Sequence, residues 1–189
     1  MIKIAIVGDI GSGKSYVANK FGYPVFSADN EVNKIYKKNK LCFNKLKKKL
    51  PKYIFSFPIN KKELSAAIIN NENNLKKINK IVHPIVRKKM KNFFKKNKNK
   101  KIVILDIPLF VENKMNNKSY KLVFVEANKR EIQKRLKKRK NYKKEIVDKL
   151  KKFQLSLITK RRISQYIIKN DFKNSSIKKK IKMIKKAIL

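Results

Sequence analysis

Short apolar runs alternate with stretches of helical periodicity along this chain, a pattern typical of a parallel sheet covered by helices. The apolar runs predict strands at residues 2–7, 24–27, 102–105, 122–125 and 166–168. The helical spacings predict helices at residues 15–21, 128–139, 143–159 and 175–188, with the second and third joined near Lys140 and Asn141. We therefore expect an α/β fold with a parallel sheet flanked by helices.

Residues 30–97 have a different pattern. They are rich in lysine, have a helical period and contain Pro51, Pro58 and Pro84, where we expect breaks. No convincing strand lies among them. This region is predicted to be a helical insertion or a substrate-binding subdomain.

The motif with the clearest chemistry lies between the first strand and the first helix. Residues 8–15 read Gly-Asp-Ile-Gly-Ser-Gly-Lys-Ser and match G-x-x-x-x-G-K-[ST], the phosphate-binding P-loop. Glycines let the backbone N–H groups point at phosphate oxygens, Lys14 supplies a cation, and Ser15 offers a hydroxyl to Mg²⁺. The alternative is a chance glycine-rich turn, but the complete motif in the correct context favours a nucleoside triphosphate site.

Charge is the unusual property of the composition. The chain of 189 residues has 53 Lys+Arg against 12 Asp+Glu, a net charge of +41. A nucleic-acid or anionic-membrane surface is one interpretation. Codon bias is the other, and we favour it because the lysines are spread through every segment. We therefore expect nucleic-acid binding only as a non-specific effect of charge, with binding of anionic ligands that weakens as salt is added.

The remaining composition narrows the class of protein. The length suits one domain. Cys42 is the single cysteine, so no internal disulfide is expected. No signal segment is predicted, and Asp106 and Pro108 interrupt the best apolar run, so no membrane-spanning segment is expected. These features favour a cytoplasmic protein, and they leave its oligomeric state open.

Two carboxylates follow predicted strands. Asp29 comes after the second strand, where it would accept a proton from an attacking hydroxyl or hold Mg²⁺ through water. The alternative is an N-cap for a helix that begins near Glu31. Asp106 ends the strand at 102–105 like a Walker-B carboxylate, and the alternative is a turn residue at a strand end.

Basic candidates lie elsewhere. His83 is the only histidine and cannot build a metal site by itself, so it either contacts an anionic substrate or caps the turn before Pro84. Arg135 and Arg139 are one turn apart on the helix predicted at 128–139. They either close over a nucleotide or form a solvated face.

Taken together, the ordered motifs resemble those of the dephospho-coenzyme A kinase family along nearly the whole chain. The matches are the loop with Gly8 and residues 10–15, Ser27-Ala28-Asp29, His83-Pro84, the run Asp-Ile-Pro-Leu-Phe-Val-Glu at 106–112, Arg135 with Arg139, and then Gln154, Lys160 and residues 167–170.

The resemblance implies a single P-loop kinase domain over residues 1–189. Its core would comprise approximately residues 1–28, 98–127 and 160–189, its helical coenzyme-A-binding insertion 29–97, and its lid 128–159. It also implies transfer of the γ-phosphate of ATP to the ribose 3′-hydroxyl of dephospho-CoA, the final step of CoA synthesis.

The resemblance further implies residue roles. Asp29 would be the catalytic base, assisted by Lys14 and Arg139. Residues implied at ATP are Gly11, Ser12, Gly13, Lys14, Ser15, Tyr16, Arg135 and Asn170, with Asn170 and its neighbours flanking the adenine. Residues implied at the acceptor substrate are Asp29, Lys61, His83 and Asp106, and Ser15 would contact Mg²⁺.

Several positions depart from the family pattern. Ser27 replaces the first Asp of Asp-Ala-Asp, and Lys61 replaces an arginine and lacks its bidentate grip. Ile132 stands where a glutamine is usual, and Asp9 takes the place of a glycine inside the anion-binding loop. Because an inward carboxylate would repel the triphosphate, we expect Asp9 to point outward or to pair with a lysine.

Two other functions remain as alternatives. The first is another P-loop kinase that acts on a nucleoside or nucleotide. The second, suggested by the net charge of +41, is a nucleic-acid-binding ATPase. It would need basic and aromatic residues clustered along one groove, and the aromatic residues here lie mainly among apolar positions.

Overall fold

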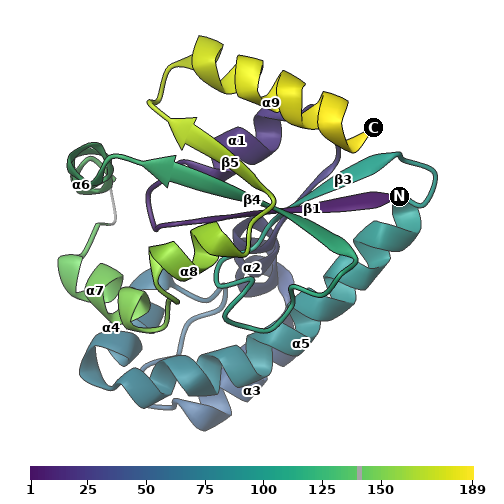
Figure 1. The fold of residues 1–189 in the computed structure, drawn as a ribbon. Coiled ribbons are helices and arrows are strands. Elements are labelled where there is room, and N and C mark those ends of the chain that lie inside the picture. Colours follow the sequence, from purple (N-terminus) through teal and green to yellow (C-terminus); the bar gives the residue numbers. More distant parts are fainter. Residues whose placement is uncertain (140–141) are drawn as a thin grey trace. The chain divides into compact units, whose positions relative to one another are not determined.

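The structure, a computed structural model, describes residues 1–139 and 142–189, which divide into two compact units (Figure 1). The first, which we call the sheet unit, comprises Met1–Ser27, Asn97–Lys143 and Leu150–Leu189. The second, the helical unit, comprises Ala28–Lys96 and Lys144–Lys149.

The sheet unit is built on a five-stranded parallel sheet. Its strands are β1 (Ile2–Gly8), β2 (Val25–Ser27), β3 (Ile102–Asp106), β4 (Tyr120–Ala127) and β5 (Tyr166–Asn170), in the order β2-β3-β1-β4-β5. Each predicted strand is present, and every pairing is parallel. The α/β fold predicted from the periodicity is confirmed.

Helices cover this sheet because its central strands are apolar on both faces. Helices α1 (Lys14–Lys20) and α9 (Asn174–Ile188) pack together against one face, and α8 (Leu157–Arg162) contacts β1 from the other (Figure 1). Ile4, Val17 and Ile177 are fully buried in the resulting core. The strand β1 is thereby held firmly, and the P-loop follows it directly.

The regular elements of the helical unit are all helices within its described residues. They are α2 (Ala28–Lys38), α3 (Lys40–Lys49), α4 (Lys61–Asn70), α5 (Glu72–Lys96) and the first part of α7 (Lys144–Lys152). Ile35, Leu46 and Ile78 pack in a core of their own. Cys42 is a buried free thiol in this core, and burial raises its pKa.

The break expected at Pro84 is wrong, because α5 continues through that residue. Proline removes only one hydrogen bond from a helix ladder, and its ring strains the preceding turn. Packing compensates for that cost, since Ile78, Val82 and Met90 are buried along the same helix. The breaks expected at Pro51 and Pro58 are present, because both residues lie between α3 and α4.

The helix predicted at 143–159 is two helices, α7 and α8. Phe153 is the C-cap of α7, and the Ser156 side chain accepts a hydrogen bond from the Thr159 N–H as the N-cap of α8. The helix predicted at 128–139 is α6 (Lys129–Lys137). The expected joint at Lys140 and Asn141 lies outside the described residues.

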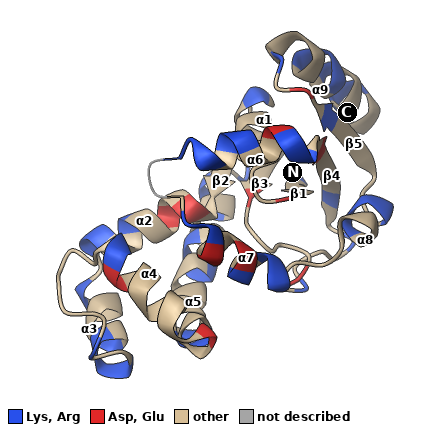
Figure 2. Ribbon diagram, turned by 90° about the vertical axis from the view of Figure 1, so that its left-hand side faces the viewer, with Lys and Arg blue, Asp and Glu red and all other residues tan. Residues whose placement is uncertain are grey.

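The division into units differs in part from the predicted organisation. The segment Ala28–Lys96 has nearly the bounds of the expected insertion at 29–97. The expected lid at 128–159 is not one unit, because α6 belongs to the sheet unit and Lys144–Lys149 to the helical unit. Lysine and arginine are present on helices of both units (Figure 2).

Candidate phosphate-binding site

The loop between β1 and α1 is shaped by glycines that no other residue can replace without strain. Gly8, Gly11 and Gly13 have φ values of +147°, +86° and +90°. A Cβ atom on Gly8 would lie 2.5 Å from the Val125 carbonyl oxygen, and one on Gly13 would lie 2.4 Å from Asn170 Nδ2. Both the dihedral angles and the close neighbours therefore require glycine.

Helix α6 covers the same loop. A Cβ atom on Gly11 would lie 3.0 Å from Ile132 Cγ2 and 3.0 Å from Leu136 Cγ. These two side chains are the buried residues of α6. Ile132, which departs from the family pattern, thus serves as an apolar contact that seats α6 on the loop.

Backbone donors remain in this loop for an anion. The Ser12 N–H donates to the Asp9 carbonyl at 3.2 Å, and the Val17 N–H donates to the Gly13 carbonyl at 3.0 Å. Among the described residues, the N–H groups of Gly11, Gly13 and Ser15 make no hydrogen bond. Such a run of N–H groups at a glycine-rich turn is suited to phosphate oxygens.

Lys14 lies over the loop that carries it. Its Nζ donates to the Asp9 carbonyl at 2.7 Å and to the Gly8 carbonyl at 3.4 Å. These two carbonyl contacts hold the ammonium group against the loop, where a phosphate would bind. The cation and the donor groups are therefore in one place, as the motif predicts.

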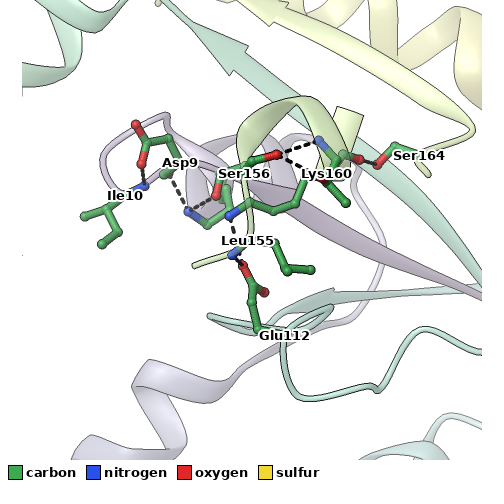
Figure 3. A network of polar contacts seen from close by, with 10 residues as sticks. Asp9, Ile10, Glu112, Leu155, Ser156, Lys160 and Ser164 are labelled. Carbon is green, nitrogen blue, oxygen red and sulfur yellow. Dashed lines mark hydrogen bonds and ion pairs between the residues drawn. The ribbon is translucent and has the colours of Figure 1, made fainter. Parts of the chain in front are cut away.

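Asp9 uses its carboxylate within the loop. Oδ1 accepts a hydrogen bond from the Ile10 N–H at 2.7 Å. Of the two expected alternatives, pairing with a lysine is not found among the described residues, because none of them forms an ion pair with Asp9. In Figure 3 the carboxylate turns toward Ile10, away from Glu112 and Lys160.

The end of β5 supports the other side of the loop. Asn170 is 4% exposed, and its Nδ2 donates to the Ser12 carbonyl at 2.7 Å while its Oδ1 accepts from the Phe172 N–H at 2.8 Å. The Arg135 guanidinium lies 3.8 Å from the centroid of the Phe172 ring. The structure thus brings two predicted ATP residues, Asn170 and Arg135, to the P-loop.

The other predicted arginine, Arg139, lies beyond the end of the helix α6 that carries Arg135. Helix α6 ends at Lys137, and the Arg139 N–H closes a turn on the Leu136 carbonyl at 3.1 Å. The helix predicted at 128–139 therefore stops short of Arg139, and the two arginines are not both within it.

Ser15 and Tyr16 open the helix that follows the loop, and both are exposed. The Tyr16 hydroxyl donates to Asn174 Oδ1 at 2.9 Å, which ties α1 to α9. No group of three or more His, Cys, Asp or Glu residues that could hold a metal ion is found in the described part of the chain. A metal at Ser15 would therefore depend on few protein ligands.

Asp106 lies at the same edge of the sheet as the P-loop. It is the last residue of β3, which pairs in parallel with β1, and it is 5% exposed. The carboxyl ends of parallel strands meet at one edge, so Asp106 and the loop after β1 are close neighbours in the fold.

A buried ion pair near this edge was missed by the sequence analysis. Lys160 Nζ lies 3.0 Å from Glu112 Oε1, with the two side chains 3% and 10% exposed. Glu112 also accepts from the Leu155 N–H at 3.0 Å, so it joins the segment after β3 to the start of α8 (Figure 3). Both residues belong to quoted motifs, but nothing in their spacing pairs them.

The remaining candidates lie in the helical unit. Asp29 is exposed in the first turn of α2, which begins at Ala28, so the alternative of an N-cap before Glu31 is wrong. Lys61 is the exposed first residue of α4.

His83 is half-buried within α5, so it does not cap a turn before Pro84. Burial, and then the charge of Arg87 one turn away, lowers the pKa of His83. The imidazole is therefore neutral at pH 7, where it can donate one hydrogen bond and accept another.

Comparison with known proteins identifies the family. The family model for dephospho-CoA kinase matches residues 2–176. The chain is also 34% identical over 170 residues to a dephospho-CoA kinase from Wolbachia pipientis wMel, with 87% of each chain covered. The chain belongs to the dephospho-CoA kinase family. It is therefore an ATP-dependent phosphotransferase, and the P-loop described above is that of a kinase.

A further relative agrees with this assignment, and two solved structures have a similar fold. A dephospho-CoA kinase from a Wolbachia of Brugia malayi is 30% identical, with 96% of this chain and 95% of the relative covered. A crystal structure from Thermus thermophilus is similar, with a TM-score of 0.79 and 25% identity over 100% of this chain and 97% of that one. A dephospho-CoA kinase from Campylobacter jejuni has the same fold, with a TM-score of 0.64 and 23% identity over 98% of this chain and 96% of that one.

Within the described residues, no helix is both long and apolar enough to span a bilayer.

Proposed function

We propose that this chain transfers the γ-phosphate of ATP to the ribose 3′-hydroxyl of dephospho-CoA, producing CoA and ADP. Membership of the dephospho-CoA kinase family carries this proposal. The glycine-shaped loop with its unbonded N–H groups and Lys14 supports it from the side of the nucleotide.

In the proposed mechanism, the loop holds the phosphates of ATP. The N–H groups of Gly11, Ser12, Gly13 and Ser15 and the Lys14 ammonium group bind the β- and γ-phosphate oxygens. The Ser12 N–H and Lys14 leave the Asp9 carbonyl to do so. Ser12 Oγ is buried without a partner among the described residues, and a bound phosphate or water would satisfy it.

The residues present suit Mg²⁺, which usually keeps several waters and binds few protein groups. The exposed Ser15 offers a hydroxyl at the loop, and Asp106 offers a carboxylate at the same sheet edge. When bound there, Mg²⁺ would neutralise charge on the phosphates.

Asp29 is the proposed catalytic base, and Lys61 and His83 are proposed to bind dephospho-CoA. The 3′-hydroxyl loses its proton to the Asp29 carboxylate as its oxygen forms a bond to the γ-phosphorus. The bond from that phosphorus to the β–γ bridging oxygen breaks, and ADP leaves. The exposure of Asp29 at the start of α2 supports this role, because a base must reach the substrate.

The base of ATP is proposed to lie near the stacked side chains of Phe172 and Arg135. Tyr16 lies on the adjoining helix and is 42% exposed, which leaves part of its surface for the nucleotide. Arg139 would add positive charge near the transferring phosphoryl group.

The decisive experiment incubates the purified protein with ATP, Mg²⁺ and dephospho-CoA and follows the products by mass. We expect CoA to form, with one ADP for each CoA, and the Lys14→Ala variant to form at least a thousandfold less. Nucleosides and nucleoside monophosphates are assayed in parallel. Phosphorylation of one of these in preference to dephospho-CoA, or ATP hydrolysis stimulated by nucleic acid with no phosphorylated small molecule, would overturn the proposal.

A further inference from the structure

Asn170 is placed to act on the shape of the P-loop. Its side chain is 4% exposed, and both ends of its amide are engaged by backbone groups. Nδ2 donates to the Ser12 carbonyl at 2.7 Å, and Oδ1 accepts from the Phe172 N–H at 2.8 Å. The second N–H of Nδ2 and the second lone pair of Oδ1 are not used in these bonds, but the burial of the side chain leaves them little access to a base.

The Ser12–Gly13 peptide depends on this contact. Gly13 has a φ of +90°, and a Cβ atom there would lie 2.4 Å from Asn170 Nδ2. The amide of Asn170 therefore occupies the space directly against the loop, and its hydrogen bond fixes the direction of the Ser12 carbonyl. With that carbonyl fixed, the N–H of Gly13 on the same peptide is fixed as well.

The opposite end of the same amide leads to Arg135. The bond to the Phe172 N–H holds a turn in which Phe172 has a φ of +63°, an uncommon value for an aromatic residue. That turn presents the Phe172 ring to the Arg135 guanidinium at 3.8 Å from the ring centroid. Stacking of this kind restrains the direction of the guanidinium group.

We propose that Asn170 is a positioning residue that couples the phosphate-binding loop to Arg135, and that it does not contact the adenine. This inference rests on the proposed function for the identity of the nucleotide site. It differs from the role that the family resemblance implies for Asn170, which is to flank the adenine. The Asn170 nitrogen holds the backbone of the P-loop at Ser12. The Asn170 oxygen holds the turn that carries Phe172, on whose ring Arg135 stacks.

A ligand without a base separates the two roles. Inorganic tripolyphosphate carries the phosphate chain alone, so binding of tripolyphosphate, ATP and GTP is measured by calorimetry for the wild type and for variants. We expect Asn170→Ala to weaken tripolyphosphate about tenfold, because the Ser12 carbonyl loses its donor, and to weaken ATP and GTP by at least as much, because the turn that carries Phe172 is released as well. Asn170→Asp should weaken them about a hundredfold, because a carboxylate oxygen would face the carbonyl oxygen. Asn116→Asp, at an exposed asparagine of the same unit, controls for the added charge.

The outcome that overturns the proposal is equally clear. If Asn170→Ala weakens ATP while tripolyphosphate binds as to the wild type, Asn170 does not hold the phosphate-binding loop and the proposal is wrong. Phe172→Leu is the matched comparison, because it keeps the bond from Asn170 to Ser12. We expect it to weaken ATP and to leave tripolyphosphate unchanged.

Coupling to Arg135 is tested by a double-mutant cycle on kcat/KM for ATP. We expect Arg135→Ala to lower kcat/KM by a factor at least threefold smaller in the Asn170→Ala background than in the wild type. The reason is that Asn170→Ala has already released the Phe172 turn on which Arg135 stacks. Losses that simply multiply would show that the two residues act independently. A merely structural role for Asn170 would lower the melting temperature without producing this coupling.

A variant that does not fold, and failure of the proposed function itself, must both be distinguished from failure of the positioning role. If Asn170→Asp does not fold, Asn170→Ala and the cycle carry the test, since alanine adds no charge and no bulk. If tripolyphosphate binding depends on Asn170 but the wild type forms no CoA, the proposed acceptor substrate is wrong and the positioning role of Asn170 stands. If CoA forms but tripolyphosphate binding is independent of Asn170, the function stands and the positioning role is wrong.

Discussion

The sheet unit and the helical unit use their buried polar groups in different ways. In the sheet unit, the buried Asn170 and the Lys14 amine are bonded to carbonyls of the P-loop itself. In the helical unit, the buried Glu63 accepts from the N–H groups of Phe55 and Ser56 at 3.1 and 3.4 Å. The buried Asn74 donates to the Ala67 carbonyl at 2.9 Å.

The two units therefore differ in whether a change at a candidate functional residue also changes the stability of the fold. In the sheet unit the candidate site is made by close packing, so a change there alters both the fold and phosphate binding. In the helical unit the buried polar groups hold the backbone, and the candidate residues Asp29 and Lys61 are exposed. We therefore expect activity to be separable from stability in the helical unit and inseparable from it at the P-loop.

The largest effect is expected at Asp29. Asp29→Asn keeps the shape of the side chain and removes the base, so kcat should fall about a thousandfold while the protein stays folded, with a melting temperature lower by only a few degrees because the first turn of α2 loses one negative charge. Glu31→Gln is the matched control in the same turn of α2, and it should retain full activity. A near-normal rate for Asp29→Asn would remove Asp29 from the proposed role.

The second-largest effect is expected at Gly13, where alanine should lower the unfolding free energy more than alanine at Gly22 of the same unit does. Gly13→Ala combines a strained φ with a contact at 2.4 Å, whereas a Cβ on Gly22, with a φ of +72°, would meet only Lys185 Nζ at 3.9 Å. Gly22→Ala should cost about 1–2 kcal/mol of unfolding free energy from strain alone, and Gly13→Ala about 3 kcal/mol or more. Denaturant unfolding measures both, and only Gly13→Ala should also weaken tripolyphosphate binding. Equal costs would show that the contact with Asn170 is unimportant.

Glu63 provides the reverse test, because a change there should lower stability and leave activity unchanged. Glu63→Gln removes the charge from a buried acceptor and should lower the unfolding free energy by about 1–3 kcal/mol. Because Glu63 is bonded, within the part of the chain that the structure describes, to its own unit's backbone and to Ser56, kcat/KM for ATP should stay within twofold. A large kinetic change at unchanged stability would contradict the separation of roles.

The smallest effect is the pH dependence from His83. Burial and Arg87 lower its pKa in the folded state below the unfolded value of about 6.5. The unfolded chain therefore binds more protons just below pH 6.5, and stability is lost as the pH falls from 6.5 toward the folded pKa. Unfolding measured from pH 7 to 5 should show this slope, and His83→Gln should reduce it. An unchanged slope would show that other groups cause it.

The sequence predicts the sheet unit well because its signals are local. Apolar runs mark the strands, and the glycines and Lys14 of the P-loop lie next to one another in the chain. The position of Asp106 at the carboxyl edge of the sheet then follows from its place at the end of a parallel strand. The strand order β2-β3-β1-β4-β5 is not predicted, because it depends on pairings between segments far apart in the chain.

The misses are features that depend on tertiary contacts. Pro84 lies inside α5 because buried neighbours offset the lost hydrogen bond. The break between α7 and α8 has a local signal in the capping residue Ser156, which the helical period conceals. The Glu112–Lys160 pair and the bond from Asn170 to Ser12 join residues far apart in the chain, so spacing alone cannot reveal them.

The bonds of Lys14 to the Gly8 and Asp9 carbonyls bear on how nucleotide affinity is to be interpreted. Before a triphosphate can bind the Lys14 ammonium group, that group must give up the hydrogen bonds it already makes to these carbonyls. The measured enthalpy of association will therefore be smaller than the strength of the new ammonium–phosphate contacts. A calorimetric titration that gives a modest heat is thus compatible with a strongly held phosphate chain.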